Sequence, residues 1–123
     1  MMHPDVQEAV MEVCEGLTGP EHVYARLQMD FANNLPAVLV MAEQNDGEVL
    51  AEHRVDFEVY GVDLPATRAL ARVITSTLAD RQHATSAGML DPARVESPPK
   101  ELPYPDPSTQ RYSFTLVIPT RAV

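Results

Sequence analysis

The sequence has little of several residue types on which whole classes of protein depend. It contains one cysteine (Cys14), one lysine (Lys100), no tryptophan and only five glycines among 123 residues. A single cysteine excludes a disulfide within the chain and leaves the redox compartment open. The glycines form no GxxxxGK[ST], GxGxxG or GxSxG pattern, so neither a phosphate-binding loop nor a nucleophile elbow is indicated.

Basic residues as a whole are scarce. Nine Lys and Arg stand against 18 Asp and Glu, which gives a formal net charge of -9. Duplex DNA and anionic lipid are bound through clustered basic side chains, so we expect neither sequence-specific nucleic-acid binding nor binding to a membrane. No segment approaches the roughly 18 apolar residues of a membrane span, and the first residues lack the pattern of an export signal. We therefore expect assembly in a cytoplasm.

Patterns that carry chemistry are also missing. The four histidines show no HxH, HxxxH or HExxH spacing, so no metal site and no cofactor is predicted. Asp56 and Glu58 are alternate residues of an expected strand, which places them on one face about 7 Å apart, a spacing that could serve acid-base chemistry. Solvated sheet faces carry such pairs routinely, and no apolar enclosure is indicated that would separate their pKa values. We predict no enzyme, with a small α+β hydrolase-type enzyme using this pair as an alternative.

Hydrophobic periodicity predicts two helices. Residues 4–18 have apolar side chains at helical spacing, with Val6, Val10, Val13 and Leu17 in one stripe beside Ala9 and Cys14. A longer helix is expected over 63–78, since Asp63 suits the N-cap and Pro65 suits the first turn. Its predicted apolar stripe consists of Ala66, Leu70, Val73, Ile74, Thr77 and Leu78.

Alternating or continuous apolar runs predict the strands, which we place at 23–29, 37–44, 48–60, 89–95 and 111–119. Asn45, Asp46 and Gly47 form the strongest turn signal, so the strands on either side should pair as an antiparallel hairpin. In the second of these strands one face is expected to join the core (Val55, Phe57, Val59) and the other to meet water or a partner (Asp56, Glu58, Tyr60). The expected fold is α+β: a mostly antiparallel four- to five-stranded sheet packed by one long helix plus an N-terminal helix, in a single domain over 1–123.

The segment 97–108 is rich in proline. It holds five of the eleven prolines, which exclude a helix or a central strand. We expect an extended, stiff arm that carries Tyr104. Such a segment is either a solvated loop or an assembly arm, because extended arms and edge strands can add to the sheet of a neighbour. Copies joined head to tail would close into a ring.

The order of these elements resembles a known family. The stretches "LPAVLVMAEQNDG", "VDFEVYGVDLPATRALARVI", "SAGMLDPARVESPPKELPYPDP" and "QRYSFTLVIPTRA", preceded by an N-terminal helix, are similar to the tail terminator proteins of long, flexible-tailed bacteriophages, also called minor tail or tail completion proteins. The similarity runs from about Pro4 to Arg121. It contains no catalytic signature, so it transfers no active site.

This resemblance implies a structural virion protein of the tail, near the neck. Members of the family close into a hexameric ring that caps the tail tube, stops its polymerisation and faces the head-side neck. The implied partners are other copies of the chain, the major tail tube protein and a connector or stopper protein of the neck. Phage DNA would pass through the ring, and a negatively charged lumen would let it slide without adhering. The expected interface residues are Glu43, Asn45, Asp46, Gly47, Glu48, Asp56, Glu58, Tyr60, Tyr104, Arg111 and Arg121.

Two further functions remain open from the sequence. One is another neck component of the same structural class, such as a head-closure or connector subunit. An acidic adaptor that binds a basic host protein is the third possibility, and its binding would weaken as salt rises.

Overall fold

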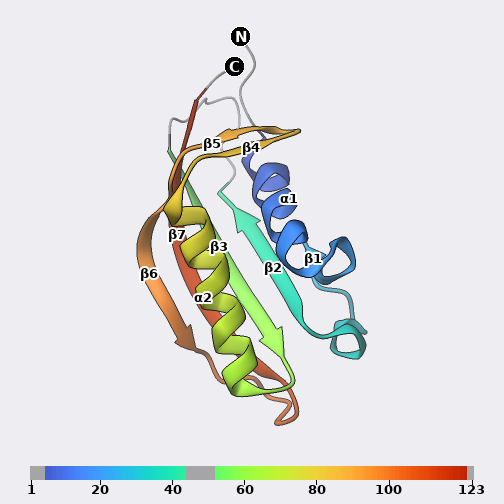
Figure 1. The fold of residues 1–123 in the computed structure, drawn as a ribbon. Coiled ribbons are helices and arrows are strands. Elements are labelled where there is room, and N and C mark those ends of the chain that lie inside the picture. Colours follow the sequence, from blue (N-terminus) through green and yellow to red (C-terminus); the bar gives the residue numbers. More distant parts are fainter. Residues whose placement is uncertain (1–4, 44–51, 122–123) are drawn as a thin grey trace.

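The protein consists of a mixed β-sheet with both helices packed on one face (Figure 1). The computed structural model describes residues 5–43 and 52–121. The helices are α1 (Val6–Thr18) and α2 (Leu64–Asp80), with two short 3-10 turns, η1 (Pro20–His22) and η2 (Phe31–Asn34). The strands are β1 (Val23–Tyr24), β2 (Ala37–Ala42), β3 (Glu52–Gly61), β4 (His83–Thr85), β5 (Gly88–Leu90), β6 (Arg94–Glu101) and β7 (Gln110–Arg121).

The strand order in the described residues is β1-β2-β3-β7-β5-β4. Strand β6 lies off this path and pairs with β7, on the same edge of β7 as β5 but at different residues. All pairs are antiparallel except the short parallel pair β1-β2. The α+β class is therefore confirmed, but the sheet is larger than predicted and is mixed. The strand predicted over 89–95 is divided, since β5 covers Gly88–Leu90 and β6 begins at Arg94. Sequence periodicity missed β4, which is only three residues long, and most of β6, which lies in the segment predicted as an extended arm.

The predicted hairpin pairing is confirmed for the two strands. β2 runs antiparallel to β3, with Val40 opposite Phe57 and Val38 opposite Val59. The turn predicted at 45–47 lies outside the described residues. On β3 the side chains of Val55, Phe57 and Val59 are buried on the face that α2 covers, as their alternation predicts.

Helix α2 begins where the sequence predicts. The Asp63 carboxylate accepts a hydrogen bond from the Ala66 amide at 2.9 Å, and Pro65 lies in the first turn. The predicted stripe is wrong in part, since Val73 is 45% exposed and Ala66 is also exposed. The buried face instead consists of Thr67, Ala71, Ile74 and Leu78. Small side chains on this face let the helix approach the sheet closely, which a hydrophobicity pattern does not record.

Helix α1 packs against β1 and β2 at the other side of the same face. Asp5 caps it by accepting from the Glu8 amide, and the buried residues are Val6, Ala9, Val10 and Cys14. The predicted stripe holds for its first turns only, because Leu17 at the end of the helix is 39% exposed.

The strand predicted over 23–29 is wrong beyond Tyr24. Only Val23 and Tyr24 pair with β2, and the chain then bends toward η2. Met29, which the alternation assigned to a buried face, is fully exposed. A segment with alternating apolar residues forms a strand only where a neighbouring strand has free backbone groups to pair with it. Beyond Tyr24, β2 leaves few such groups available.

The free edge of β2 is closed by a side chain of α1. The Gln7 side-chain nitrogen donates to the Val40 carbonyl at 2.7 Å, and its side-chain oxygen accepts from the Ala42 amide at 2.8 Å. The amide thus makes both hydrogen bonds that a further strand would make at this point, and it protects the edge from pairing with another chain.

Replacing Gln7 by alanine should therefore cost about 1–2 kcal/mol, because two backbone groups of a half-buried edge lose their partners. A Gln82→Ala variant is the matched control: Gln82 also donates through its side chain, to Asp91 at 2.7 Å, but on an exposed surface. Its expected loss is below about 0.5 kcal/mol. Urea denaturation measures both, and equal losses would contradict the edge role of Gln7.

The proline-rich segment begins as β6, which pairs only with β7 and so forms a sheet edge. Its register shifts twice, between Val95 and Ser97 and between Ser97 and Lys100. Pro98 and Pro99 lie in the second of these irregular stretches, where a missing N–H group breaks no regular ladder bond. After β6 the chain turns through Tyr104 and Asp106 and returns as β7.

Candidate assembly surface

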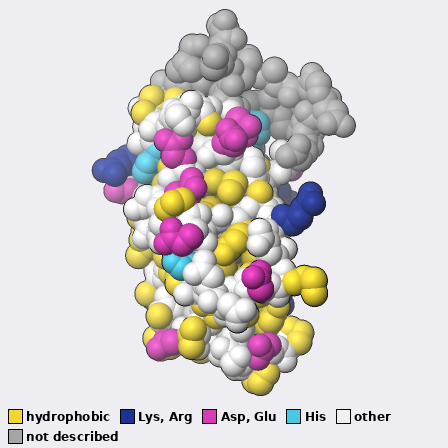
Figure 2. Space-filling view, turned by 90° about the vertical axis from the view of Figure 1, so that its right-hand side faces the viewer, with side chains coloured by type: hydrophobic (Ala, Val, Ile, Leu, Met, Phe, Trp, Pro, Cys, Tyr) yellow, Lys and Arg dark blue, Asp and Glu magenta, His cyan; other side chains and the backbone are white. Residues whose placement is uncertain are grey.

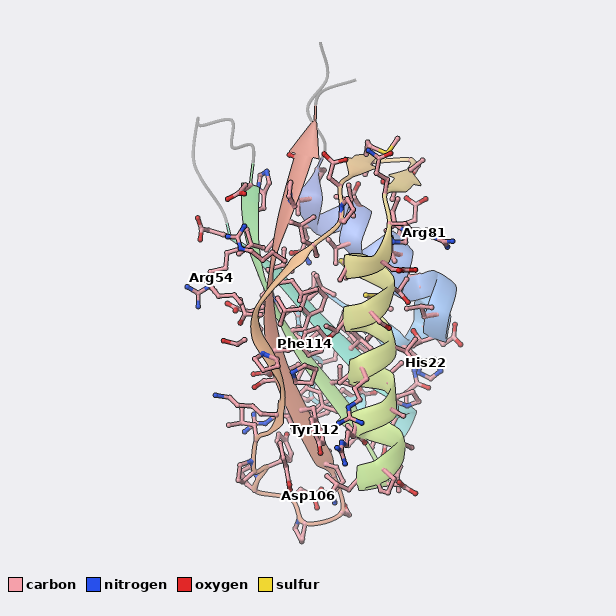
Figure 3. All side chains as sticks on the ribbon, turned by 60° about the vertical axis from the view of Figure 1, so that its left-hand side comes forward. His22, Arg54, Arg81, Asp106, Tyr112 and Phe114 are labelled. Atoms are coloured by element: carbon pink, nitrogen blue, oxygen red, sulfur yellow. The ribbon has the colours of Figure 1, made fainter. Side chains whose placement is uncertain are left out.

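The face of the sheet opposite the helices carries four of the eleven predicted interface residues, Asp56, Glu58, Tyr60 and Arg111. In Figure 3 the labelled Phe114 and Tyr112 lie between β7 and α2, whereas Arg54 points away from the helices on the other side. This polar face is formed by alternate residues of β3 and β7, together with β6.

An aromatic cluster closes one end of the polar face. It consists of Phe31 from η2, Tyr60 from the end of β3 and Tyr104 from the turn after β6. Ring centroids are 4.9 Å apart for Phe31 and Tyr60, 5.5 Å for Tyr60 and Tyr104, and 6.1 Å for Phe31 and Tyr104, all edge to face. Tyr60 is only 2% exposed, so the prediction that its side chain faces solvent or a partner is wrong: other residues of the same chain cover it. Residues distant in sequence cover it, a contact that strand alternation cannot reveal.

Arg111 fastens the turn of the proline-rich segment to this cluster. Its guanidinium carbon lies 5.2 Å from the centroid of the Tyr104 ring. Two guanidinium nitrogens donate to backbone carbonyls, Nη2 to Pro103 at 2.6 Å and Nε to Leu102 at 3.4 Å. Tyr104 and Arg111, expected as separate interface residues, therefore form one local unit.

The tip of the same turn is held by Asp106. The Ser108 amide and hydroxyl both donate to one carboxylate oxygen, at 2.9 and 2.7 Å. These two bonds, the backbone one first, lower the pKa of Asp106 from its ordinary value. The turn therefore carries a charged carboxylate at neutral pH.

Tyr60 and Glu58 form a hydrogen-bonded pair. The Tyr60 hydroxyl donates to the Glu58 carboxylate at 2.5 Å. Burial, and next the hydrogen bond to Glu58, raise the pKa of Tyr60 to about 12, although nearby Arg111 acts in the opposite direction. Tyr60 is accordingly a neutral donor at physiological pH and offers no phenolate for catalysis.

Asp56 belongs to a second network, further along the strand. The Thr115 hydroxyl donates to its carboxylate at 2.6 Å, and Arg54 Nε lies 3.8 Å from the same oxygen. Arg54 Nε also lies 3.3 Å from a Glu96 oxygen, which links β3 to β6 across β7. All of these charged groups are about half exposed, so their ion pairs contribute little stability but orient the side chains.

The structure brings together only some of the predicted interface residues. Glu58, Tyr60, Tyr104 and Arg111 meet at the aromatic cluster, and Asp56 lies two residues along β3. Glu43 is exposed just after β2, and the Arg121 backbone pairs with Met89 at the end of β7. Residues 45–48 lie outside the described ranges. Sequence reasoning missed Thr115 and Glu96, whose positions depend on strand register, and Phe31, which reaches the cluster from the 3-10 turn η2.

Catalytic arrangements are not evident in the described residues. Burial raises the pKa of the Cys14 thiol to about 12, with a smaller effect of Glu15, so this cysteine is an inert core residue. Within 5–43 and 52–121 no group of three or more His, Cys, Asp or Glu could hold a metal ion. In the same ranges, neither helix has the length and apolar character that crossing a bilayer requires.

These features define an α+β chain in which two helices cover one face of a mixed sheet and the other face is polar. No protein-family model matches the chain, and no curated protein matches it in sequence. Among solved structures it is similar to a chain of a structure titled "Virion of native gene transfer agent (GTA) particle". The TM-score is 0.62 at 17% sequence identity, and the match covers 94% of this chain and 93% of that chain. The two chains share the fold over almost their whole length.

Proposed function

We propose that this chain is a structural virion protein, a tail terminator that forms a closed ring, a hexamer, on the end of a tail tube. The observation that carries the proposal is the fold shared with a chain of the gene transfer agent virion over 94% of this chain. The order of sequence elements, which resembles tail terminators, supports the finer assignment.

The polar face and its edges suit a protein that works through surfaces. The carboxylates with acid-base spacing are engaged as acceptors, Asp56 by Thr115 and Glu58 by Tyr60, and neither is enclosed. A net charge of -9 suits a ring through which DNA passes, because a negatively charged wall does not retain a polyanion. The ring would bind the tail tube protein on one side and a neck protein on the other, within the tail near the neck.

Deleting the gene tests the proposal directly. Without a terminator the tube protein keeps polymerising, so we expect tails of variable, excessive length that do not join heads, measured by electron microscopy of lysates. Supplying the chain in trans should restore uniform, joined tails. The Asp56→Asn/Glu58→Gln variant should also restore them, because Asn and Gln still accept the hydrogen bonds from Thr115 and Tyr60 and the proposal assigns the two carboxylates no acid-base chemistry.

Tails of normal, uniform length that join heads without this chain would refute the proposal. Uniform tails that fail to join heads would instead indicate another neck component. Locating the chain in a map of the assembled particle distinguishes these positions, since a terminator contacts the last ring of the tube and a head-closure subunit does not.

A further inference from the structure

The two helices carry opposite charge on their exposed sides. The sequence of α1, VQEAVMEVCEGLT, contains three glutamates and no basic residue. Glu8, Glu12 and Glu15 recur at helical spacing on the side opposite the buried Ala9 and Val10. Figure 2, which views this side of the molecule, shows acidic side chains along its described length and basic side chains only at its margins.

The exposed side of α2 is basic instead. Arg68 and Arg72 are both exposed and stand four residues apart, so they neighbour each other on one helix face. Within the described part of the chain neither arginine lies in an ion pair. Two like charges at this spacing destabilise an isolated helix. In a chain with twice as many acidic as basic residues, this arginine pair is a basic surface that an acidic partner would complement.

Apolar surface accompanies the arginines. Leu64, which is 36% exposed, precedes Arg68 by four residues and so neighbours it on the same helix face. Exposed arginine beside apolar side chains is the composition of interface centres, where arginine is enriched and lysine is depleted. This α2 face (Leu64, Arg68, Arg72) is therefore a candidate docking surface.

A complementary surface lies on α1. A hollow of about 420 Å³ is lined by Glu8, Met11, Glu12, Glu15 and Ser86, and we call it the α1 hollow. Glu12 is already engaged there by the Ser86 amide and hydroxyl, at 3.0 and 2.7 Å to the same oxygen. Glu8 and Glu15 line the hollow on either side, so a guanidinium that enters it would meet carboxylates and the apolar Met11 side chain.

The two surfaces lie on different helices. Helix α1 packs against β1, β2 and the β4–β5 hairpin, whereas α2 covers β3, β7 and β6, so the two surfaces are different parts of the chain. A contact between the α1 hollow of one copy and the α2 face of the next is therefore heterologous, and it repeats in one direction. Repetition with a closing rotation gives a ring.

We infer that the α2 face of one subunit docks into the α1 hollow of the next subunit and forms the ring contact. The inference rests on the proposed function, which requires contacts between copies. A second copy is the occupant that the charges favour, because the chain itself carries both halves of the complementary pair. A nucleic acid is disfavoured by the net charge of -9.

Charge reversal tests the contact. An Arg68→Glu/Arg72→Glu variant and a Glu8→Arg/Glu15→Arg variant should each associate at least about 100-fold more weakly than the wild type, because like charges then face each other. Sedimentation velocity and light scattering measure the association. An Arg26→Glu/Lys100→Glu variant changes the net charge by as much as the first variant, but both residues are exposed and lie outside the two surfaces, so it should assemble normally.

Mixing the two charge-reversed variants tests the contact most directly. The two reversed variants combined in equal amounts should assemble again, because each then presents an acidic surface to a basic one at every contact. Their subunits must alternate, so only rings with an even number of subunits can close, a condition that a hexamer meets. Circular dichroism of each variant establishes that the isolated subunits remain folded.

Failure of the contact and failure of the proposed function are distinguishable. A wild-type oligomer that neither reversal disturbs, or a mixture that stays monomeric, overturns this contact and leaves the tail assignment in place. A wild-type chain that stays monomeric at about 1 mM also overturns it. The tail assignment falls only with the deletion result.

Discussion

Replacing Phe114 by alanine should lower the free energy of unfolding by about 4 kcal/mol. Phe114 lies on β7 opposite Phe57 on β3, and the two rings stack with centroids 4.6 Å apart and an interplanar angle of 9°. Both side chains are at most 2% exposed. Truncation leaves a cavity at the centre of the sheet, under α2, where backbone hydrogen bonds prevent the strands from closing over it.

A loss of this size is a large part of the roughly 5–15 kcal/mol that stabilises a typical domain, so the variant should be partly unfolded at 37 °C. Guanidinium denaturation followed by circular dichroism measures the loss. The Phe57→Ala and double variants complete a cycle, and the two rings should couple by about 0.5–1.5 kcal/mol. Val95→Ala, at a residue 42% exposed on β6, is the control and should change stability by less than about 0.5 kcal/mol. A Phe114→Ala loss below about 1 kcal/mol would contradict the packing described here.

Replacing Gly61 by alanine should cost about 2–3 kcal/mol, because the added methyl group has no room. A Cβ atom at this position would lie 2.1 Å from Thr67 Oγ1 and 3.2 Å from Thr67 Cβ. Thr67 cannot easily withdraw, since it is 2% exposed and its hydroxyl donates to the Asp63 carbonyl at 2.7 Å. The end of β3 and the first turns of α2 would have to separate.

Gly16 provides the opposite case within the same chain. It lies in α1 with no atom within 4 Å of an added Cβ, so Gly16→Ala should stabilise the protein by up to about 1 kcal/mol through helix propensity. Thermal unfolding compares the two variants. Adding Thr67→Ala to Gly61→Ala should recover part of the loss, because it removes the nearest atom. A Gly61→Ala variant that is as stable as the wild type would contradict the close packing of α2 against the end of β3.

Together these variants distinguish residues that stabilise the core from residues on the surfaces that the proposed function uses. Phe114 and Gly61 hold the helix layer to the sheet, whereas the α1 hollow and the α2 face lie on the outer sides of the helices. Core variants should therefore reduce ring formation only as far as they unfold the subunit, while the charge-reversed variants should remain folded and fail to assemble.

Local pattern was enough for several elements. The alternation of Val55, Phe57 and Val59 predicts which face of β3 is buried, because strand geometry sends successive side chains to opposite faces. Asp63 and Pro65 predict where α2 begins, because capping depends only on the first turn of a helix. The pairing of β2 with β3 follows from their closeness in the chain, and the α+β class follows from the mixture of periodicities.

Only the tertiary structure decided which surfaces remain exposed. Tyr60 alternates with the buried face of β3 and yet is covered, because Phe31 and Tyr104 reach it from distant segments. Val73 fits an apolar stripe and yet is exposed, because the sheet meets α2 through Thr67 and Ala71. Periodicity is a local property of the chain, whereas burial depends on which faces meet. For that reason the sequence by itself determined the two helices, the β2–β3 pair and the closing strand β7, whereas tertiary packing decided the remaining strands and the faces that the protein offers to a partner.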